Sequence, residues 1–150
     1  MSQSLCRTLV HLVFSTKNRV PYLVPRIHEP LRAYLGGILR NQESPVLSVG
    51  PVADHVHILF SQSKNHALAE LVEEVKKSSS KWFKTQGVEF GDFHWQAGYG
   101  AFSVSASRVP AVERYIRSQE KHHHKNTFQE EFRRFLKEYE IEYDERYVWD

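Results

Sequence analysis

The feature of this sequence that most limits its fold is the stretch DHVHILF at positions 54–60. Two histidines, His55 and His57, stand two positions apart, and β-forming apolar residues fill the positions between and after them. Successive side chains of a β-strand point to opposite faces. The stretch therefore predicts a strand with an apolar core face and a histidine face.

The histidine pair has two interpretations. The Cβ atoms of two residues on the same face of a strand lie roughly 6–7 Å apart, because a strand rises about 3.3 Å per residue. Two imidazoles at this spacing can converge on one cation or phosphate. Histidines on a half-buried strand are also commonly structural, so this motif alone leaves both a metal site and a structural pair open.

The remaining chain alternates between strand and helix patterns. Apolar runs predict strands at 9–14 and 46–49 and short strands around 93–95 and 98–105, whereas helical spacing predicts helices over 27–42, 67–85 and 111–119. Thr127 and Glu130 form a capping box that starts a last helix. This order predicts an α+β fold, with a ferredoxin-like or RRM-like antiparallel sheet and helices packed on one face.

Composition narrows the class of protein. With 150 residues, 41% of them hydrophobic and 25% charged, the chain is typical of one globular domain, which we expect to span residues 1–150. No apolar run has the length of a membrane span, and the N-terminus lacks a signal-peptide pattern. The single cysteine, Cys6, excludes an internal disulfide framework and a zinc site with several thiolates. We expect a cytosolic protein.

The charges are unevenly distributed. Residues 1–128 contain 16 lysines and arginines against 10 acidic residues, whereas residues 129–150 contain 4 against 8. A basic body with an acidic, aromatic tail at about 140–150 is compatible with a polyanionic partner. On the helix over 67–85, three lysines share one face, either as a solvated surface or as a phosphate-binding stripe; they are Lys77, Lys81 and Lys84.

The helix over 111–119 carries a possible nucleophile. Tyr115 and Gln119 are one turn apart and share a face, and His122 continues the same line. Tyr115 alone is equally compatible with an ordinary core or surface aromatic. A phenol attacks phosphorus once it loses its proton, and its reference pKa near 10 means that it needs assistance at neutral pH.

A metal at the histidine strand would provide that assistance. Held by His55 and His57, it would polarise and orient a phosphate, and Gln119 could add an oxygen ligand. Imidazole and amide ligands suit Mn²⁺, and suit Mg²⁺ less well, since Mg²⁺ prefers oxygen and water.

Several motifs together resemble one known family. The stretch DHVHIL at 54–59 is similar to the His-hydrophobic-His (HUH) motif, and YIRSQ at 115–119 is similar to the Tyr-x-x-x-Gln helix of single-tyrosine HUH transposases. These are the enzymes of the smallest bacterial insertion sequences, and the REP-associated tyrosine transposases are their relatives. Further similar segments bring the resemblance to nearly the full chain; they are VFSTKNR at 13–19, QEKHH at 119–123 and EYDERYVWD at 142–150.

The resemblance implies a specific activity and site. The family cuts single-stranded DNA when its tyrosine attacks a phosphodiester, which leaves a 5′-phosphotyrosine and a free 3′-OH, and the reverse attack rejoins strands. Carried over to this sequence, Tyr115 is the nucleophile, and a divalent metal, Mg or Mn, is bound by His55, His57 and Gln119. Lys17 and Arg19, together with the three helix lysines named above, are our candidates for contacts to the DNA backbone.

The resemblance also implies partners and a location. Family members bind DNA with hairpin ends and form homodimers, in which the tyrosine helix can complete the partner's histidine site. It implies a bacterial cytoplasmic protein that acts on nucleoid DNA. The sequence does not decide whether Tyr115 acts on the histidines of its own subunit.

Two alternative functions remain open at this point. One is a non-catalytic nucleic-acid-binding module on the same sheet, with Phe93 and Trp95 of a short strand exposed to stack bases. The other is a domesticated relative that cleaves dispersed repeats with the same residues. The histidine cluster at 122–124 is a solvated helix end, an auxiliary ligand set or a phosphate contact.

Overall fold

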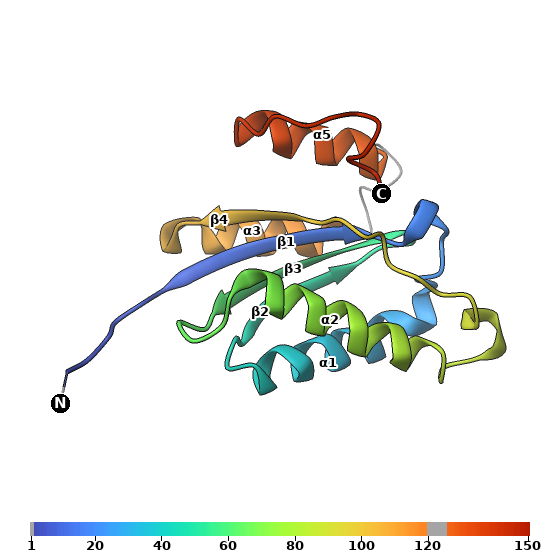
Figure 1. Ribbon diagram of the computed structural model, residues 1–150, viewed down its shortest axis with the longest axis horizontal. Helices are drawn as coiled ribbons and strands as arrows, with labels where there is room; N and C mark the ends of the chain where they lie inside the picture. The colour runs from blue at the N-terminus through green and yellow to red at the C-terminus, as the bar shows by residue number, and fades with distance from the viewer. Residues whose placement is uncertain (1, 120–125) are drawn as a thin grey trace.

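A computed structural model describes residues 2–119 and 126–150 of the protein (Figure 1). The strands are β1 (Thr8–Ser15), β2 (Val46–Pro51), β3 (His55–Gln62) and β4 (Gly100–Val104). The helices are α1 (Pro25–Asn41), α2 (Leu68–Phe83), α3 (Val109–Arg117) and α5 (Phe128–Glu138), with short 3₁₀ turns η1 (Lys17–Arg19), η2 (Val88–Phe90) and η3 (Ala106–Arg108). Among the described helices, none is both long and apolar enough to cross a membrane.

The four strands form one antiparallel sheet in the order β2-β3-β1-β4. The histidine strand, β3, is therefore central and pairs with a strand on each side. Its register with β1 places His57 opposite Val13 and His55 opposite Ser15. This arrangement confirms the predicted α+β fold with a ferredoxin-like sheet.

One face of the sheet packs against α1 and α2 (Figure 1). The apolar residues that alternate with the histidines and follow them, Val56, Ile58 and Phe60, are fully buried on this side and join Leu12 and Phe14 of β1. The predicted core face of β3 is thus the main hydrophobic core of the protein.

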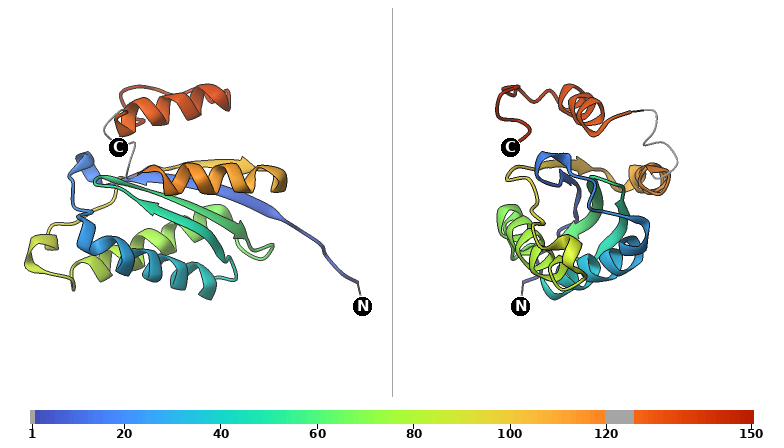
Figure 2. Two further views of the ribbon diagram at one scale, coloured as in Figure 1. Left: turned by 180° about the vertical axis from the view of Figure 1, so that it is seen from behind. Right: turned by 90° about the vertical axis from the view of Figure 1, so that its right-hand side faces the viewer.

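The opposite face carries the histidines and is covered by α3 and α5, a layer that the ferredoxin-like prediction did not include (Figure 2). Helix α5 packs on β1 and β4, where its apolar residues form a second core; the members are Val13, Phe102, Phe128, Phe132 and Leu136. Helix α3 lies against β2 at Gly50, where a Cβ atom would meet Ile116 Cγ2 at 2.5 Å.

Of the one or two short strands predicted over 93–105, the described residues form one, β4. Residues 93–95 form no ladder, and Trp95 makes only an isolated bridge with Thr16. Phe93 and Trp95 are buried in the main core, where they pack on Phe83 and Phe14. Buried rings cannot stack bases, so this structural basis for a non-catalytic binding module is absent.

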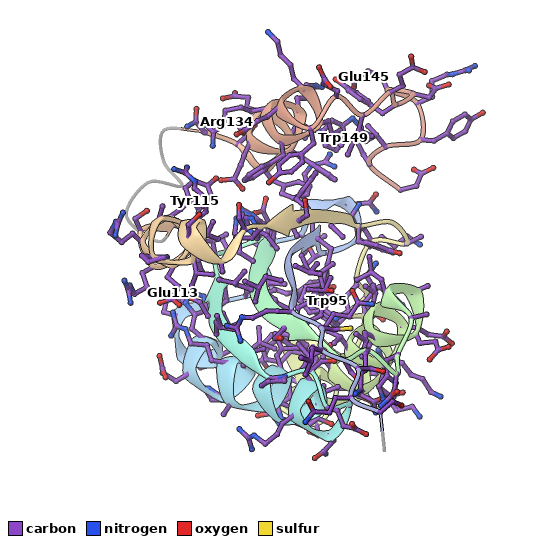
Figure 3. All side chains as sticks on the ribbon, turned by 90° about the vertical axis from the view of Figure 1, so that its left-hand side faces the viewer. Trp95, Glu113, Tyr115, Arg134, Glu145 and Trp149 are labelled. Atoms are coloured by element: carbon purple, nitrogen blue, oxygen red, sulfur yellow. The ribbon has the colours of Figure 1, made fainter. Side chains whose placement is uncertain are left out.

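The aromatic C-terminal tail docks on the fold. Trp149 packs against Phe128 and Phe132 of the second core. The backbone N–H of Gly98 donates a hydrogen bond to the Asp150 carbonyl at 2.7 Å. The tail therefore holds α5 against the sheet (Figure 3).

Candidate active site

Strand β3 directs His55 and His57 to the same face, as the alternation predicted, and both are buried. They meet Glu131 of α5, whose Oε1 lies 2.9 Å from His57 Nε2 and 3.3 Å from His55 Nε2. The ligand atoms of this His-His-Glu group lie within 4.8 Å of one another. Helix α5 thus closes the histidine face with a carboxylate.

The three converging atoms fit a cation. His55 Nε2, His57 Nε2 and Glu131 Oε1 are buried and face one another, yet none makes a well-aligned hydrogen bond in the described part of the chain. Buried polar atoms normally have such bonds, so three of them converging on one point favour a shared ligand. Two imidazoles and a carboxylate are a common donor set for divalent metals.

The outer nitrogen of each imidazole is also held. His55 Nδ1 lies 2.8 Å from Asp54 Oδ1, and His57 Nδ1 lies 2.9 Å from Nε2 of His11 on β1. Such partners fix the ring orientation and the tautomer of a metal-binding histidine. With Nδ1 bonded outward, each Nε2 is presented to the shared point beside Glu131.

Burial and the neighbouring charges set the protonation of this group. Burial lowers the pKa of His57, and lowers the pKa of His11 to about 3, so both are neutral at pH 7. Burial alone would also lower the pKa of His55 and raise that of Glu131. The Asp54 and Glu131 carboxylates instead raise the pKa of His55, and the two histidines hold the pKa of Glu131 well below its usual value.

Tyr115 of α3 lies beside this group, and its ring centroid is 5.6 Å from that of His57. Its hydroxyl donates a hydrogen bond to Glu131 Oε2, and Arg134 Nη2 donates to the same hydroxyl at 3.1 Å. Figure 3 shows Tyr115 and Arg134 on the facing elements α3 and α5. Burial and the Glu131 charge raise the pKa of Tyr115, while Arg134 opposes this shift.

Gln119 lies just after α3 and is buried. Its Nε2 donates to the Tyr115 carbonyl at 3.4 Å, and its side chain also interacts with His57. The four residues named from the sequence for catalysis and metal binding therefore lie in one place within a single chain. Tyr115 faces the histidines of its own subunit.

Two important residues were missed by the sequence analysis. Glu131 follows the helix cap and is acidic in the first turn, a placement typical of any helix N-terminus. His11 is a polar residue within a buried strand, and this anomaly was the available signal for a site residue.

The predicted DNA contacts fall in two places. Lys17 and Arg19 lie in η1, directly after β1, and Arg19 lines a cavity of about 340 Å³ together with Asp54 and His55. Lys77 and Lys81 lie in α2 and Lys84 directly follows it, on the side of the sheet opposite to α5 (Figure 2). The histidine cluster at 122–124 lies outside the described residues.

Comparisons with known proteins agree with this geometry. A curated relative, the ISDra2 transposase TnpA of Deinococcus radiodurans, is 25% identical over 114 residues, which are 73% of this chain and 81% of the relative. A crystal structure of a transposase candidate from Deinococcus radiodurans R1 has the same fold, with a TM-score of 0.62 and 21% identity over 80% of this chain and 98% of that one.

A REP-associated tyrosine transposase bound to a REP hairpin also has the same fold, with a TM-score of 0.61 and 14% identity over 82% of this chain and 74% of that one. The sequence profile described as "Transposase IS200 like" matches residues 4–119, which include both histidines of β3, Tyr115 and Gln119. The chain therefore belongs to the IS200-like transposase family.

Proposed function

We propose that this transposase cleaves and rejoins single-stranded DNA through a covalent bond to Tyr115, with the help of a divalent cation. One observation carries the proposal: a single carboxylate, Glu131, contacts the Tyr115 hydroxyl with one oxygen and both histidines with the other. The nucleophile is therefore adjacent to the cation site. The neutral His57 imidazole and the ionised Glu131 carboxylate are in the protonation states that bind metals, and a cation bound at His55 would displace the proton from its Nε2.

The reaction exchanges one ester for another. The Tyr115 oxygen forms a bond to phosphorus as the bond from phosphorus to the 3′ oxygen breaks, and the tyrosine loses its proton while the departing oxygen gains one. The product carries a 5′-phosphotyrosine and a free 3′-OH. Attack by a 3′-OH on the phosphotyrosine reverses the step, so no nucleotide cofactor is consumed.

The residues that would hold the cation are His55, His57 and Glu131, with Gln119 as a further ligand. Mg²⁺ or Mn²⁺ bound there would draw charge from the phosphate and favour its attack by a phenol. The ligand atoms are buried beneath α5, so α5 has to shift locally before a phosphate reaches them. Arg134 would stabilise the negative charge that develops on the Tyr115 oxygen.

The proposal includes partners and a location. Single-stranded DNA with hairpin ends is the expected substrate, and the binding of a REP hairpin by a protein of the same fold supports this choice. Lys17, Arg19 and the α2 lysines are proposed to contact the backbone. A homodimer in the bacterial cytoplasm, at nucleoid DNA, is proposed from the family resemblance, and light scattering after size exclusion would measure its mass.

Covalent trapping tests the function. Wild-type protein incubated with Mn²⁺ and labelled single-stranded DNA from the flanks of its own gene should give a protein–DNA adduct on a denaturing gel. Tyr115→Phe should bind the same DNA and form no adduct, and EDTA should abolish the adduct of the wild type. Binding by the wild type without an adduct, under all cation conditions, would instead support a non-catalytic binding module.

A further inference from the structure

A second cavity is lined by Tyr115 and His11 but by neither His55 nor His57. It has a volume of about 320 Å³ and lies between the end of β4, α3 and α5. Cavities of about 300 Å³ and above are typical of small-ligand sites. The lining includes Tyr115 itself, two arginines and the aromatic residue directly after α5; these are Arg108, Arg134 and Tyr139.

The two arginines have charge available for a ligand. Arg134 donates to the Tyr115 hydroxyl but forms no ion pair with a described carboxylate, and the Arg108 guanidinium makes no hydrogen bond or ion pair within the described residues. Glu138 also lines the cavity, yet it pairs with neither of them. Two unpaired guanidinium groups near a nucleophile favour a phosphate.

The cavity also offers an aromatic surface. Tyr139 is 39% exposed, and its hydroxyl donates to the Ser103 carbonyl at 2.9 Å while its ring packs on Phe102 at a centroid distance of 4.8 Å. These contacts fix the ring and leave part of it open to the cavity. A fixed, partly exposed tyrosine beside arginines is the chemistry with which proteins hold single-stranded nucleotides.

The position of the cavity relates it to the reaction. The cation ligands are closed to solvent, whereas Tyr115 is only half-buried and lines this open space. Arg134 connects the cavity with Tyr115, because it lines the cavity and also donates a hydrogen bond to the Tyr115 hydroxyl. A strand whose scissile phosphate meets Tyr115 would thus place an adjacent nucleotide in the cavity.

We propose that this cavity is a subsite for one nucleotide next to the scissile phosphate, with its base against Tyr139 and its phosphate at Arg108 and Arg134. The inference rests on the proposed function. Two of the three contact residues, Arg134 and Tyr139, lie on or next to α5, beyond the family match that ends at residue 119. The subsite therefore belongs to a part of the chain that the family profile does not cover.

The experiment uses the full-length protein and a fluorescein-labelled (dT)₁₂, with binding measured by anisotropy. Tyr139→Leu should weaken binding about tenfold, the size of one lost base stack, whereas Tyr139→Phe should retain most of the affinity. Arg108→Gln should weaken binding and reduce the salt dependence by about one phosphate contact. Lys137→Gln, on α5 outside the cavity lining, is the matched control. Thermal unfolding by circular dichroism identifies any variant that fails to fold.

Photo-crosslinking gives a second readout. A (dT)₁₂ with 5-iododeoxyuridine should crosslink to the peptide that contains Tyr139. Wild-type affinity in both Tyr139→Leu and Arg108→Gln, with no crosslink to that peptide, would overturn the subsite even if Tyr115 adducts form. Absence of adducts together with weakened binding of the variants would overturn the proposed function and leave the nucleotide site standing.

Discussion

His57 has a close neighbour at each ring nitrogen, and this would fix its orientation as the proposed metal ligand. Nε2 faces Glu131, and Nδ1 faces His11 at 2.9 Å. If Nε2 binds a cation, the proton resides on Nδ1 and is donated to His11 Nε2. The buried, neutral His11 is therefore a positioning residue that fixes the tautomer and orientation of His57.

Replacement of His11 tests this role. His11→Leu should lower the Mn²⁺ affinity of the DNA-free protein by about 10- to 100-fold, the usual effect of losing such a partner, as measured by isothermal titration calorimetry. His11→Gln keeps a side-chain acceptor and should recover part of the affinity. His66→Leu, in the loop before α2, should have no effect, and equal affinity in all variants would contradict the role.

Glu131 makes a pH-dependent contribution to stability. Its pKa is lowered in the folded protein by the two histidines, so it is ionised when folded at pH values where the unfolded chain binds a proton. The contribution is therefore present above the ordinary pKa near 4.5 and is lost as the pH falls below it. In the presence of EDTA, the free energy of unfolding of the wild type should fall more steeply between pH 5 and 3 (about the range of carboxyl titration) than that of Glu131→Gln. Parallel curves from urea denaturation would exclude this contribution.

Residue-scale prediction succeeded where local geometry alone determines side-chain direction. The alternation of β3 was enough to place His55 and His57 together, and one helical turn was enough for Tyr115 and Gln119. Glu131 could not be identified as a site residue from the sequence, because its place in the site depends on how α5 crosses the sheet. No local pattern in the sequence encodes that crossing.

Helix α3 carries Tyr115, and its height above the sheet is set by Gly50 of β2. A Cβ atom at Gly50 would lie 2.5 Å from Ile116 Cγ2 and 2.7 Å from the Ile116 carbonyl oxygen. Since the second contact is with backbone, a side chain here has to displace the helix. The position of Tyr115 above the sheet therefore depends on the absence of a side chain at Gly50.

Gly50→Ala should accordingly impair chemistry more than DNA binding. We expect adduct formation to fall at least about tenfold, because a displacement of about 1 Å of a reacting group can cost a hundredfold in rate, while anisotropy with labelled DNA changes little. Gly37→Ala in α1 is the control, since its Cβ would meet nothing within 4 Å and a helical Ala is favoured by about 0.5–1 kcal/mol. Normal adduct yield in Gly50→Ala would show that α3 tolerates the shift.

Helix α5 is held by apolar contacts, chiefly Phe128, Phe132 and Leu136 on Val13 and Phe102. Phe132→Ala should destabilise the protein by about 3–5 kcal/mol, the usual range for a buried phenylalanine, as measured by urea denaturation. Arg133→Gln, next to it on the helix, loses a surface pair with Glu145 and the contact of its guanidinium with the Trp149 ring, and should change stability by only about 1 kcal/mol. A loss below 1 kcal/mol for Phe132→Ala would mean that α5 contributes little to the fold.

Whether a helix or strand predicted from a sequence pattern forms in the protein depended on the tertiary contacts of its side chains. The helix over 27–42 forms despite Gly36 and Gly37, because its apolar stripe is buried and Gly36 leaves room for Val46, whose Cγ2 would lie 3.3 Å from a Cβ atom at this position. The segment at 93–95 has strand-like residues, but its rings are buried in the core and its backbone finds only one bridge. Tertiary contacts decided both cases.

At the scale of the whole molecule, the sheet separates structural support from chemistry. The α1 and α2 layer encloses the main core, and the α3 and α5 layer encloses the site. That residues 1–150 unfold as one domain stays a prediction. The two layers share the central strands β1 and β3, so they are coupled through the same backbone ladder.

The arrangement of the site within one chain leads to a prediction about subunits. Tyr115 contacts Glu131 and lies against His57 of the same chain, so each chain brings together all of the proposed reacting groups. A mixture of Tyr115→Phe and His57→Ala chains should therefore form no more adduct than either variant alone, because no chain in it has both groups. If the tyrosine served the partner's histidines, a mixed dimer would contain one working site and the mixture would regain activity. Adduct yield after the two proteins are co-refolded at equal concentrations measures the difference, and co-refolded wild type shows that the procedure preserves activity.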